Sequence, residues 1–174
     1  TSKEPVRNLK LYDQQLTAAP EDLFKLTAVE RLSLRKNAIA ALPTSFAALT
    51  KLYWLDLGQN SLAGLDPAFG KLAALQTLYL SDNAITALPP EIGALARLTY
   101  LNLDHNRLTA LPPEITRLQN LRWLRLNDNQ LQQLPPDIGK LANSLQRLYL
   151  KNNRITEQEK TRLTNLLPRC EIQF

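Results

Sequence analysis

The chain has 174 residues, of which 44% are hydrophobic, with a formal net charge of +5 and one cysteine. This length and apolar content suffice for one packed domain, and no apolar stretch reaches the ~18 residues of a membrane span. One cysteine excludes an intrachain disulfide, and a mild positive charge without long runs of like charge is not diagnostic of nucleic-acid binding.

The N-terminal residues 1–7 are polar and charged and lack the pattern of a signal peptide. The chain contains no Met, so we expect a processed mature form or a fragment. Its compartment stays open, with export from a bacterium favoured over the cytoplasm. Val6 to Leu11 is predicted to form a thinly covered edge strand, and Pro5 and nearby charges oppose its pairing with a second copy. We therefore expect a monomer.

One short pattern then recurs along the chain. Its key residues lie 23 residues apart, with a last interval of 24, at Gln14, Asn37, Asn60, Asn83, Asn106, Asn129 and Asn153. Each key residue follows a Leu-x-Leu pair, the alternation of a strand with one buried face. Such long connections exclude hairpins, so the strands are predicted to be parallel. A fixed period of this size predicts stacked units that share one continuous core.

The Asn members of this series follow each strand, where the chain must turn inward. An amide donates and accepts hydrogen bonds at once, so it can satisfy the backbone groups of a buried bend. The six Asn residues from Asn37 to Asn153 are therefore predicted to form a structural ladder that links one unit to the next.

The return segments carry a Leu-Pro step followed by an apolar pair, as in Leu88-Pro89 with Ile92 and Leu95. Proline fixes φ and removes a donor, so we expect short 3₁₀ turns on the convex side. The first unit departs from the pattern, because Gln14 replaces Asn and Ala19 replaces Leu.

The C-terminal segment predicts a cap. Thr156–Glu159 has the pattern of a capping box that begins a helix, and Pro168 ends it. The apolar face of this helix is predicted to contain Leu163, Leu166 and Leu167. Ile172 and Phe174 continue the Leu-x-Leu columns, so 171–174 is predicted to form a terminal strand.

These features resemble the leucine-rich repeat family, in the class with 23-residue units and a Leu-Pro-x-x-Ile back that occurs in intracellular and bacterial proteins. The resemblance covers most of the chain. It implies an α/β repeat solenoid, a right-handed horseshoe with a parallel β-sheet on the concave face, a short 3₁₀ or irregular convex side, a capping helix and a terminal strand. It also implies one domain over residues 1–174, with seven units and a cap at 156–174, and a role in protein recognition without enzyme activity or a cofactor.

Side chains that point away from the core on the strands form the candidate binding face. Both Trp and four of the five Tyr residues fall there, whereas every Phe falls on the convex side, in a core column or in a cap. Trp, Tyr and Arg are enriched at binding hot spots. The predicted partner-binding residues are Arg31, Arg35, Trp54, Asp56, Tyr79, Tyr100, Asn102, Trp123, Arg125, Arg147 and Tyr149. The alternative is that β propensity and cross-strand packing alone place these rings in strands.

One column of this face contains Trp54, Thr77, Tyr100 and Trp123, and predicts an aromatic stripe of roughly 15 Å. Basic residues flank the stripe at both ends, so it suits a protein or peptide with an apolar anchor and acidic edges. Flat rings also suit sugars, so glycan or cell-wall recognition is an alternative, as is a fragment of a larger regulatory protein. Nucleic acid is disfavoured because central carboxylates would repel phosphates, namely Asp56, Asp82, Asp104 and Asp128.

Catalysis and metal binding find little support. His105, the one histidine, is flanked on adjacent rungs by Asp82 and Asp128, which would make binding there sensitive to pH, although a solvated polar rung explains the same pattern. A hydrolytic grouping with Ser81 lacks an enclosed pocket and oxyanion donors, and no third ligand converges for a metal. Cys170 is expected to pack between the capping helix and the terminal strand.

Overall fold

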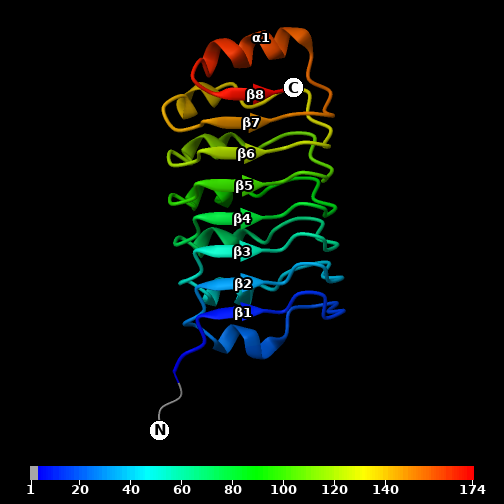
Figure 1. The fold of residues 1–174 in the computed structure, drawn as a ribbon, viewed down its shortest axis with the longest axis vertical. Coiled ribbons are helices and arrows are strands. Elements are labelled where there is room, and N and C mark those ends of the chain that lie inside the picture. Colours follow the sequence, from blue (N-terminus) through cyan, green and yellow to red (C-terminus); the bar gives the residue numbers. More distant parts are fainter. Residues whose placement is uncertain (1–3) are drawn as a thin grey trace.

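The structure, a computed structural model, describes residues 4–174 and contains one open sheet of parallel strands in sequence order (Figure 1). Each strand has three residues: β1 (Asn8–Lys10), β2 (Arg31–Ser33), β3 (Trp54–Asp56), β4 (Thr77–Tyr79), β5 (Tyr100–Asn102), β6 (Trp123–Arg125), β7 (Arg147–Tyr149) and β8 (Glu171–Gln173). The predicted α/β solenoid and its parallel strands are confirmed. We call the solvent-facing side of the sheet, the concave face of the prediction, the strand face.

The predicted 3₁₀ turns lie behind the sheet. They are η1 (Glu21–Lys25), η2 (Thr44–Ala48), η3 (Pro67–Lys71), η4 (Pro90–Ala94), η5 (Pro113–Arg117) and η6 (Ile138–Leu141). The residue before η2, η4 and η5 is the proline of the Leu-Pro step, in an extended conformation. Its fixed φ and missing donor therefore set where each turn begins.

The register turns each sequence column into a row across the sheet. Arg31 pairs with Trp54, Trp54 with Thr77, Thr77 with Tyr100, and Tyr100 with Trp123. Side chains of a strand alternate between its two faces, so residues spaced by one unit share one face. The strand face can therefore be assigned row by row.

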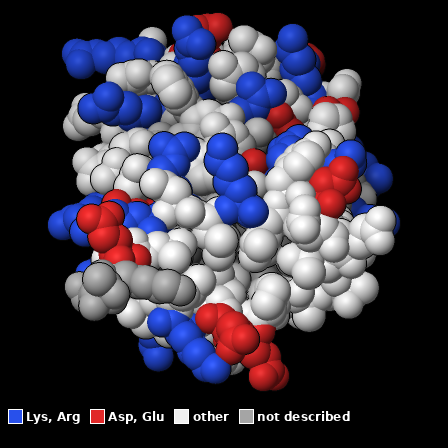
Figure 2. Space-filling view, turned by 60° about the horizontal axis from the view of Figure 1, so that its bottom comes forward, with Lys and Arg blue, Asp and Glu red and all other residues white. Residues whose placement is uncertain are grey.

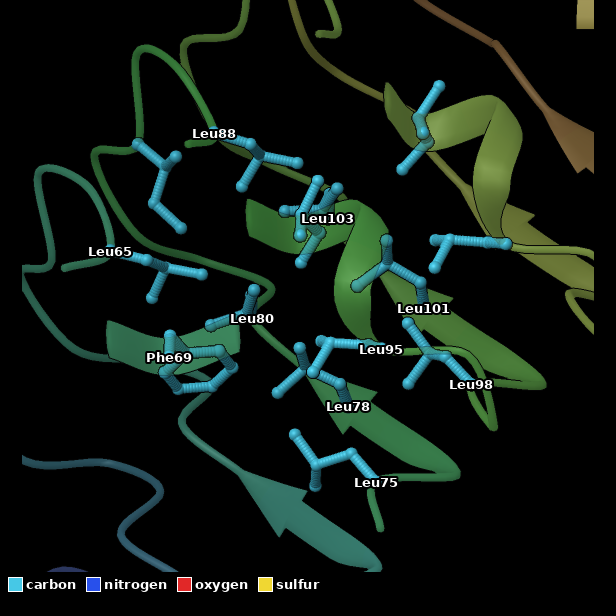
Figure 3. Close-up of a cluster of buried hydrophobic side chains, with 14 of the residues drawn as sticks. Leu65, Phe69, Leu75, Leu78, Leu80, Leu88, Leu95, Leu98, Leu101 and Leu103 are labelled. Carbon is cyan, nitrogen blue, oxygen red and sulfur yellow. The ribbon is translucent and has the colours of Figure 1, made fainter. Parts of the chain in front are cut away.

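The core fills the space between the sheet and the 3₁₀ turns. Leu78 and Leu101 of the strands meet Leu95 and Leu98 of the return segments, and all four are fully buried (Figure 3). Full burial of a leucine side chain contributes about 1.5–3 kcal/mol. Because every unit supplies the same leucines, the core continues from one unit to the next.

The Asn residues form a hydrogen-bonded ladder along one edge of the sheet. Asn83 Nδ2 donates to the carbonyl oxygens of Leu57 (3.0 Å) and Leu80 (3.1 Å), and its Oδ1 accepts from the Leu62 backbone N–H (2.9 Å). One amide thus bonds to its own unit and to the unit before it. The residue preceding each Asn has a φ between 53° and 58°, a left-handed conformation that costs a non-glycine residue about 1 kcal/mol.

The C-terminal end is closed by α1 (Glu157–Leu166) and β8. Thr156 Oγ1 accepts a hydrogen bond from the Glu159 backbone N–H (3.2 Å), as the capping box predicts. Leu163 and Leu167 are buried, and Leu166 faces Gly139 of η6 but remains 36% exposed. The buried stripe is narrow because residues 163 and 167 are four apart and lie one above the other, whereas 166 lies at its margin.

The terminal strand forms, with Ile172 beside Leu148 in the sheet. Phe174 lies beyond β8 and is 37% exposed, so it does not continue the buried column as predicted. No further unit packs over this position among the described residues, and the ring instead lies 5.6 Å from the Lys160 ammonium group.

Candidate binding surface on the strand face

Four aromatic rings form a continuous zigzag across the strand face, and we call it the aromatic path. Ring centroids are separated by 5.7 Å between Trp54 and Tyr79, 5.0 Å between Tyr79 and Tyr100, and 5.8 Å between Tyr100 and Trp123. The predicted stripe ran along a single row and was interrupted at Thr77. Tyr79, two residues further along β4 on the same face, closes that gap. The path therefore uses two rows.

The rings of the aromatic path are tilted against one another. Interplanar angles are 57°, 45° and 89° along the path. Each such ring pair contributes about 0.5–1.5 kcal/mol, so the contacts restrict the side chains before any partner arrives. Trp123 nevertheless remains 43% exposed, and the result is a ridged apolar surface that is already ordered and still open to solvent.

The carboxylates of the strand face are turned into the structure. Asp104 is 5% exposed, its Oδ2 accepts from Arg125 Nε (2.7 Å), and its Oδ1 accepts from the Asn127 backbone N–H (2.8 Å). The Arg125 guanidinium lies 4.6 Å from the centre of the Tyr149 ring. Asp104 therefore anchors Arg125, and Arg125 covers Asp104 from solvent.

Asp56 is also buried, with weaker compensation. Its Oδ1 accepts from the Gly58 backbone N–H (2.9 Å) and lies 3.8 Å from Arg35 Nη1. Burial raises the pKa of the Asp56 carboxyl above its ordinary value, and the Gly58 hydrogen bond and the Arg35 charge oppose that shift only in part. A side chain added at Gly58 would meet Arg35 at 2.7 Å, so the glycine leaves room for this pair.

The sequence did not reveal a hollow of about 590 Å³ over β1 and β2. Its lining includes Asn8, Lys10, Tyr12, Arg31, Ser33 and Trp54. The Arg31 guanidinium lies 4.8 Å from the centre of the Trp54 ring, and so joins the hollow to the aromatic path. One sequence feature could have indicated this hollow. Asn8 and Ser33 are small, whereas the same rows have aromatic residues on later strands.

The remaining predicted contact residues lie around the path. Asn102 Oδ1 accepts from the Asp104 backbone N–H (3.0 Å), and Arg147 Nε lies 3.5 Å from Glu171 Oε2. The C-terminal flank of the strand face is thus basic in sequence but largely paired in the structure.

His105 lies on the edge that follows the strands. Its Nδ1 is 3.6 Å from Asp82 Oδ1 and its Nε2 is 3.2 Å from Asp128 Oδ2, whereas Ser81 is buried. Within residues 4–174 no three His, Cys, Asp or Glu side chains are grouped so that they could hold a metal ion. The arrangement is a ladder of polar rungs.

Cys170 is the free thiol of the chain and is half-buried. Burial, together with the nearby Glu171 charge, raises the pKa of the thiol to about 11. The thiolate is the reactive form of cysteine, so this thiol is suited to packing.

The comparisons with known proteins agree with this architecture. A family model described as "Leucine rich repeat" matches residues 4–62, 50–108 and 96–155. Comparison with curated protein sequences gave no match. In the part of the chain that the structure describes, no helix is both long and apolar enough to cross a membrane.

Several solved structures are similar to this chain. A leucine-rich repeat protein of Leptospira interrogans has 30% identity and a TM-score of 0.57, over 97% of this chain and 60% of its own. A plant peptide hormone receptor in complex with RGF2 has 30% identity and a TM-score of 0.71, over 78% of this chain and 23% of its own.

The ectodomain of an Arabidopsis thaliana membrane receptor kinase, in complex with CASPARIAN STRIP INTEGRITY FACTOR 2, has 37% identity and a TM-score of 0.71, over 78% of this chain and 17% of its own. The chain therefore spans less than two thirds of the length of each of these structures.

Proposed function

Because the chain belongs to the leucine-rich repeat family, we propose that it is a non-enzymatic interaction module that binds a partner protein or peptide through its strand face. Domains of this family commonly mediate protein–protein interaction, and two of the similar structures are described as complexes with RGF2 and CASPARIAN STRIP INTEGRITY FACTOR 2. The observation that carries the proposal is the aromatic path, four rings in contact on an open face.

The rings of the aromatic path bury further apolar area when a partner covers them. Trp and Tyr side chains bury a large area at a low entropy cost, and the path already restricts their rotamers. Trp123 is 43% exposed, so a bound partner can still bury a large part of its surface. A peptide that covers the path would bury apolar surface without reordering the module.

The tilt of the rings favours a peptide over a glycan. Sugars stack on flat aromatic platforms, whereas Tyr100 and Trp123 meet at 89° and the other pairs at 57° and 45°. Such a surface offers ridges and notches that suit peptide side chains. Glycan or cell-wall recognition through the same rings remains the alternative, and a module within a larger regulatory protein is compatible with either.

Nucleic acid is the weakest candidate, although only two of the four central carboxylates, Asp82 and Asp128, are partly open to solvent. Asp104 and Asp56 are buried beneath other groups, so they repel a phosphate backbone less than their positions suggest. Seen from the N-terminal side, however, Lys and Arg side chains lie in separate groups over a mostly uncharged surface (Figure 2). Binding a phosphate backbone requires a basic patch or stripe.

The proposal is tested by affinity capture from an extract of the source organism. The bait is the whole chain, beside a Trp54→Ala/Tyr100→Ala/Trp123→Ala variant and a convex-side control, Glu114→Ala/Arg117→Ala/Lys140→Ala. We expect proteins that are retained by the wild type and the control but lost from the strand-face variant. Circular dichroism verifies that all three baits fold. Equal retention by all three would move the binding surface elsewhere and overturn the proposal.

A further inference from the structure

The positive charges of the strand face are distributed unevenly once ion pairs are considered. Arg125 pairs with Asp104 (2.7 Å) and Arg147 with Glu171 (3.5 Å). At the N-terminal end, Arg35 lies 3.8 Å from Asp56 and Lys36 lies 2.9 Å from Asp13. The strand-face cations without an ion pair among residues 4–174 are Lys10, Arg31 and Lys151.

Two of these unpaired cations line the hollow over β1 and β2. Lys10 and Arg31 both border it, and none of its lining residues is acidic. The lining also includes Asn8, Ser33 and Tyr12, whose amide and hydroxyl groups donate hydrogen bonds. The hollow therefore presents two positive charges and several neutral donors to one volume of about 590 Å³, with no negative charge on its wall.

Arg31 is held in place for this role. Its guanidinium carbon lies 4.8 Å from the centre of the Trp54 ring and 6.0 Å from that of Tyr53. A guanidinium over an aromatic face keeps its N–H groups in its own plane, where they can bind both oxygens of a carboxylate. The rings also restrict the rotamers of Arg31, so less entropy is lost when an anion binds.

We infer that the hollow over β1 and β2 is a pocket for an Asp or Glu side chain of the peptide segment that binds the aromatic path. This inference rests on the proposed function and deepens it, because it names the chemistry and the position of one partner residue. It also gives the site a direction. The acidic residue lies at the N-terminal end of the solenoid, since two unpaired cations share the hollow there, whereas at the other flank Arg125 and Arg147 are paired and Lys151 stands alone among residues 4–174.

The strand spacing sets the distance between the acidic residue and the apolar anchor. Arg31 lies on β2, and the middle of the aromatic path, Tyr79 and Tyr100, lies on β4 and β5. Two to three strand spacings of ~4.8 Å correspond to about 10–14 Å. An extended chain covers ~3.3–3.6 Å per residue, so the acidic residue precedes or follows a large apolar residue by about three or four positions.

The test is a selection of random peptides of about 12 residues, roughly 40 Å when extended, on the immobilised whole chain. A parallel selection uses the Trp123→Ala variant, so that peptides bound through the aromatic path are identified. Among those peptides we expect enrichment of Asp or Glu about three or four positions from a large apolar residue. No such enrichment would overturn the inference.

Charge variants test the pocket with one selected peptide. Lys10→Gln/Arg31→Gln should weaken binding about tenfold at low salt, because two close opposite charges are lost. Lys151→Gln/Arg154→Gln removes the same charge away from the hollow and should change affinity less than about twofold. Changing the acidic residue of the peptide to Gln or Asn should weaken its binding to the wild type about tenfold. The same change should not weaken binding to the Lys10→Gln/Arg31→Gln variant, because that variant lacks the charges that the acidic residue contacts.

The two proposals fail in different ways. If peptides depend on Trp123 but bind the Lys10/Arg31 variant as tightly as the wild type, the pocket is unused and the strand face is still the binding surface. If no selected peptide depends on Trp123, the proposed function fails, and the pocket fails with it. If both charge variants weaken binding equally, only the net charge of the module matters, and the inference is overturned.

Discussion

The aromatic rings on the convex side and those on the strand face are in similar contact but differ in how far they are exposed to solvent. Phe46 and Phe69 stack with centroids 6.1 Å apart and are 2% and 5% exposed. Tyr100 and Trp123 are in similar contact at 5.8 Å, yet Trp123 is 43% exposed. The convex pair lies in the core, whereas the strand-face pair only borders it. Ring contact on the strand face therefore leaves apolar surface in water, and under the proposed function a partner covers it.

Two buried carboxylates, Glu159 of the cap and Asp56 of the strand face, differ in a similar way, although Asp104 on the strand face is paired with Arg125. In the cap, Glu159 Oε1 accepts from the Leu134 backbone N–H (3.0 Å), and its two oxygens accept from Arg162 at 2.7 Å. On the strand face, Asp56 accepts one backbone hydrogen bond and has Arg35 at 3.8 Å. The cap residue is arranged to stabilise the fold. The strand-face residue is held at some cost to stability.

Removing one ring from each side tests whether the two sets of rings contribute differently to stability. Phe46→Ala should lower the free energy of unfolding by about 3–5 kcal/mol, because it leaves a cavity in the core. Trp123→Ala should lower it by about 1–2 kcal/mol, because the ring is 43% exposed and its removal leaves no cavity in the core. Urea denaturation of both variants measures the difference. Equal losses would show that the strand-face rings are structural, and would remove the main support for the binding surface.

The second prediction compares two amides of one unit. Asn106→Ala should destabilise the protein by about 2–4 kcal/mol, because the carbonyls of Leu80 and Leu103 and the Ile85 backbone N–H lose buried partners. Asn102→Ala removes one hydrogen bond on the strand face and should cost about 1 kcal/mol. Hydrogen exchange at Ile85 should rise in the first variant alone. A small effect of Asn106→Ala would mean that water replaces the ladder.

Much of the fold follows from local patterns. The alternation in Leu-x-Leu sets which face of each strand is buried. The interval of 23 residues, or 24 in the last unit, fixes the register, so Trp54 and Thr77 occupy one row as predicted. The repeat has this power because every unit meets the same neighbours. At the cap that condition fails, and there Leu166 on the apolar face of α1 and Phe174 after β8 remain 36% and 37% exposed.

The candidate site was predictable as a set of positions but not as a set of contacts. The rows identify Tyr79 and Tyr100 as solvent-facing, yet their contact depends on rotamers that reach across rows. The burial of Asp104 depends on Arg125, which lies on the next strand. The hollow beside Arg31 depends on how the neighbouring side chains pack around it, and a sequence pattern does not give that packing.

The pH dependence of stability separates the two carboxylates, and the expected signs are opposite. Although burial raises the pKa of Glu159, its hydrogen bonds from Arg162 and Leu134 and the Arg162 charge lower it further, so the net shift is downward. A lowered pKa contributes stability above the unfolded value of ~4.3, and that stability is lost as pH falls through the folded value. For Asp56 the folded pKa is raised, so the folded state binds its proton more tightly and stability is gained as pH falls toward ~3.9.

Neutral amides test these signs. Glu159→Gln should destabilise the protein by about 1–3 kcal/mol at pH ~7 and flatten its loss of stability in acid, because the charge-assisted hydrogen bonds are removed. Asp56→Asn should be neutral or stabilising at pH ~7 and should steepen the loss in acid, because the gain from protonating Asp56 disappears. Urea midpoints between pH ~3 and ~7 measure both slopes. If both variants change the pH dependence of the free energy of unfolding in the same direction, Glu159 and Asp56 have similar environments. The contrast between the core and the strand face would then be limited to the aromatic rings.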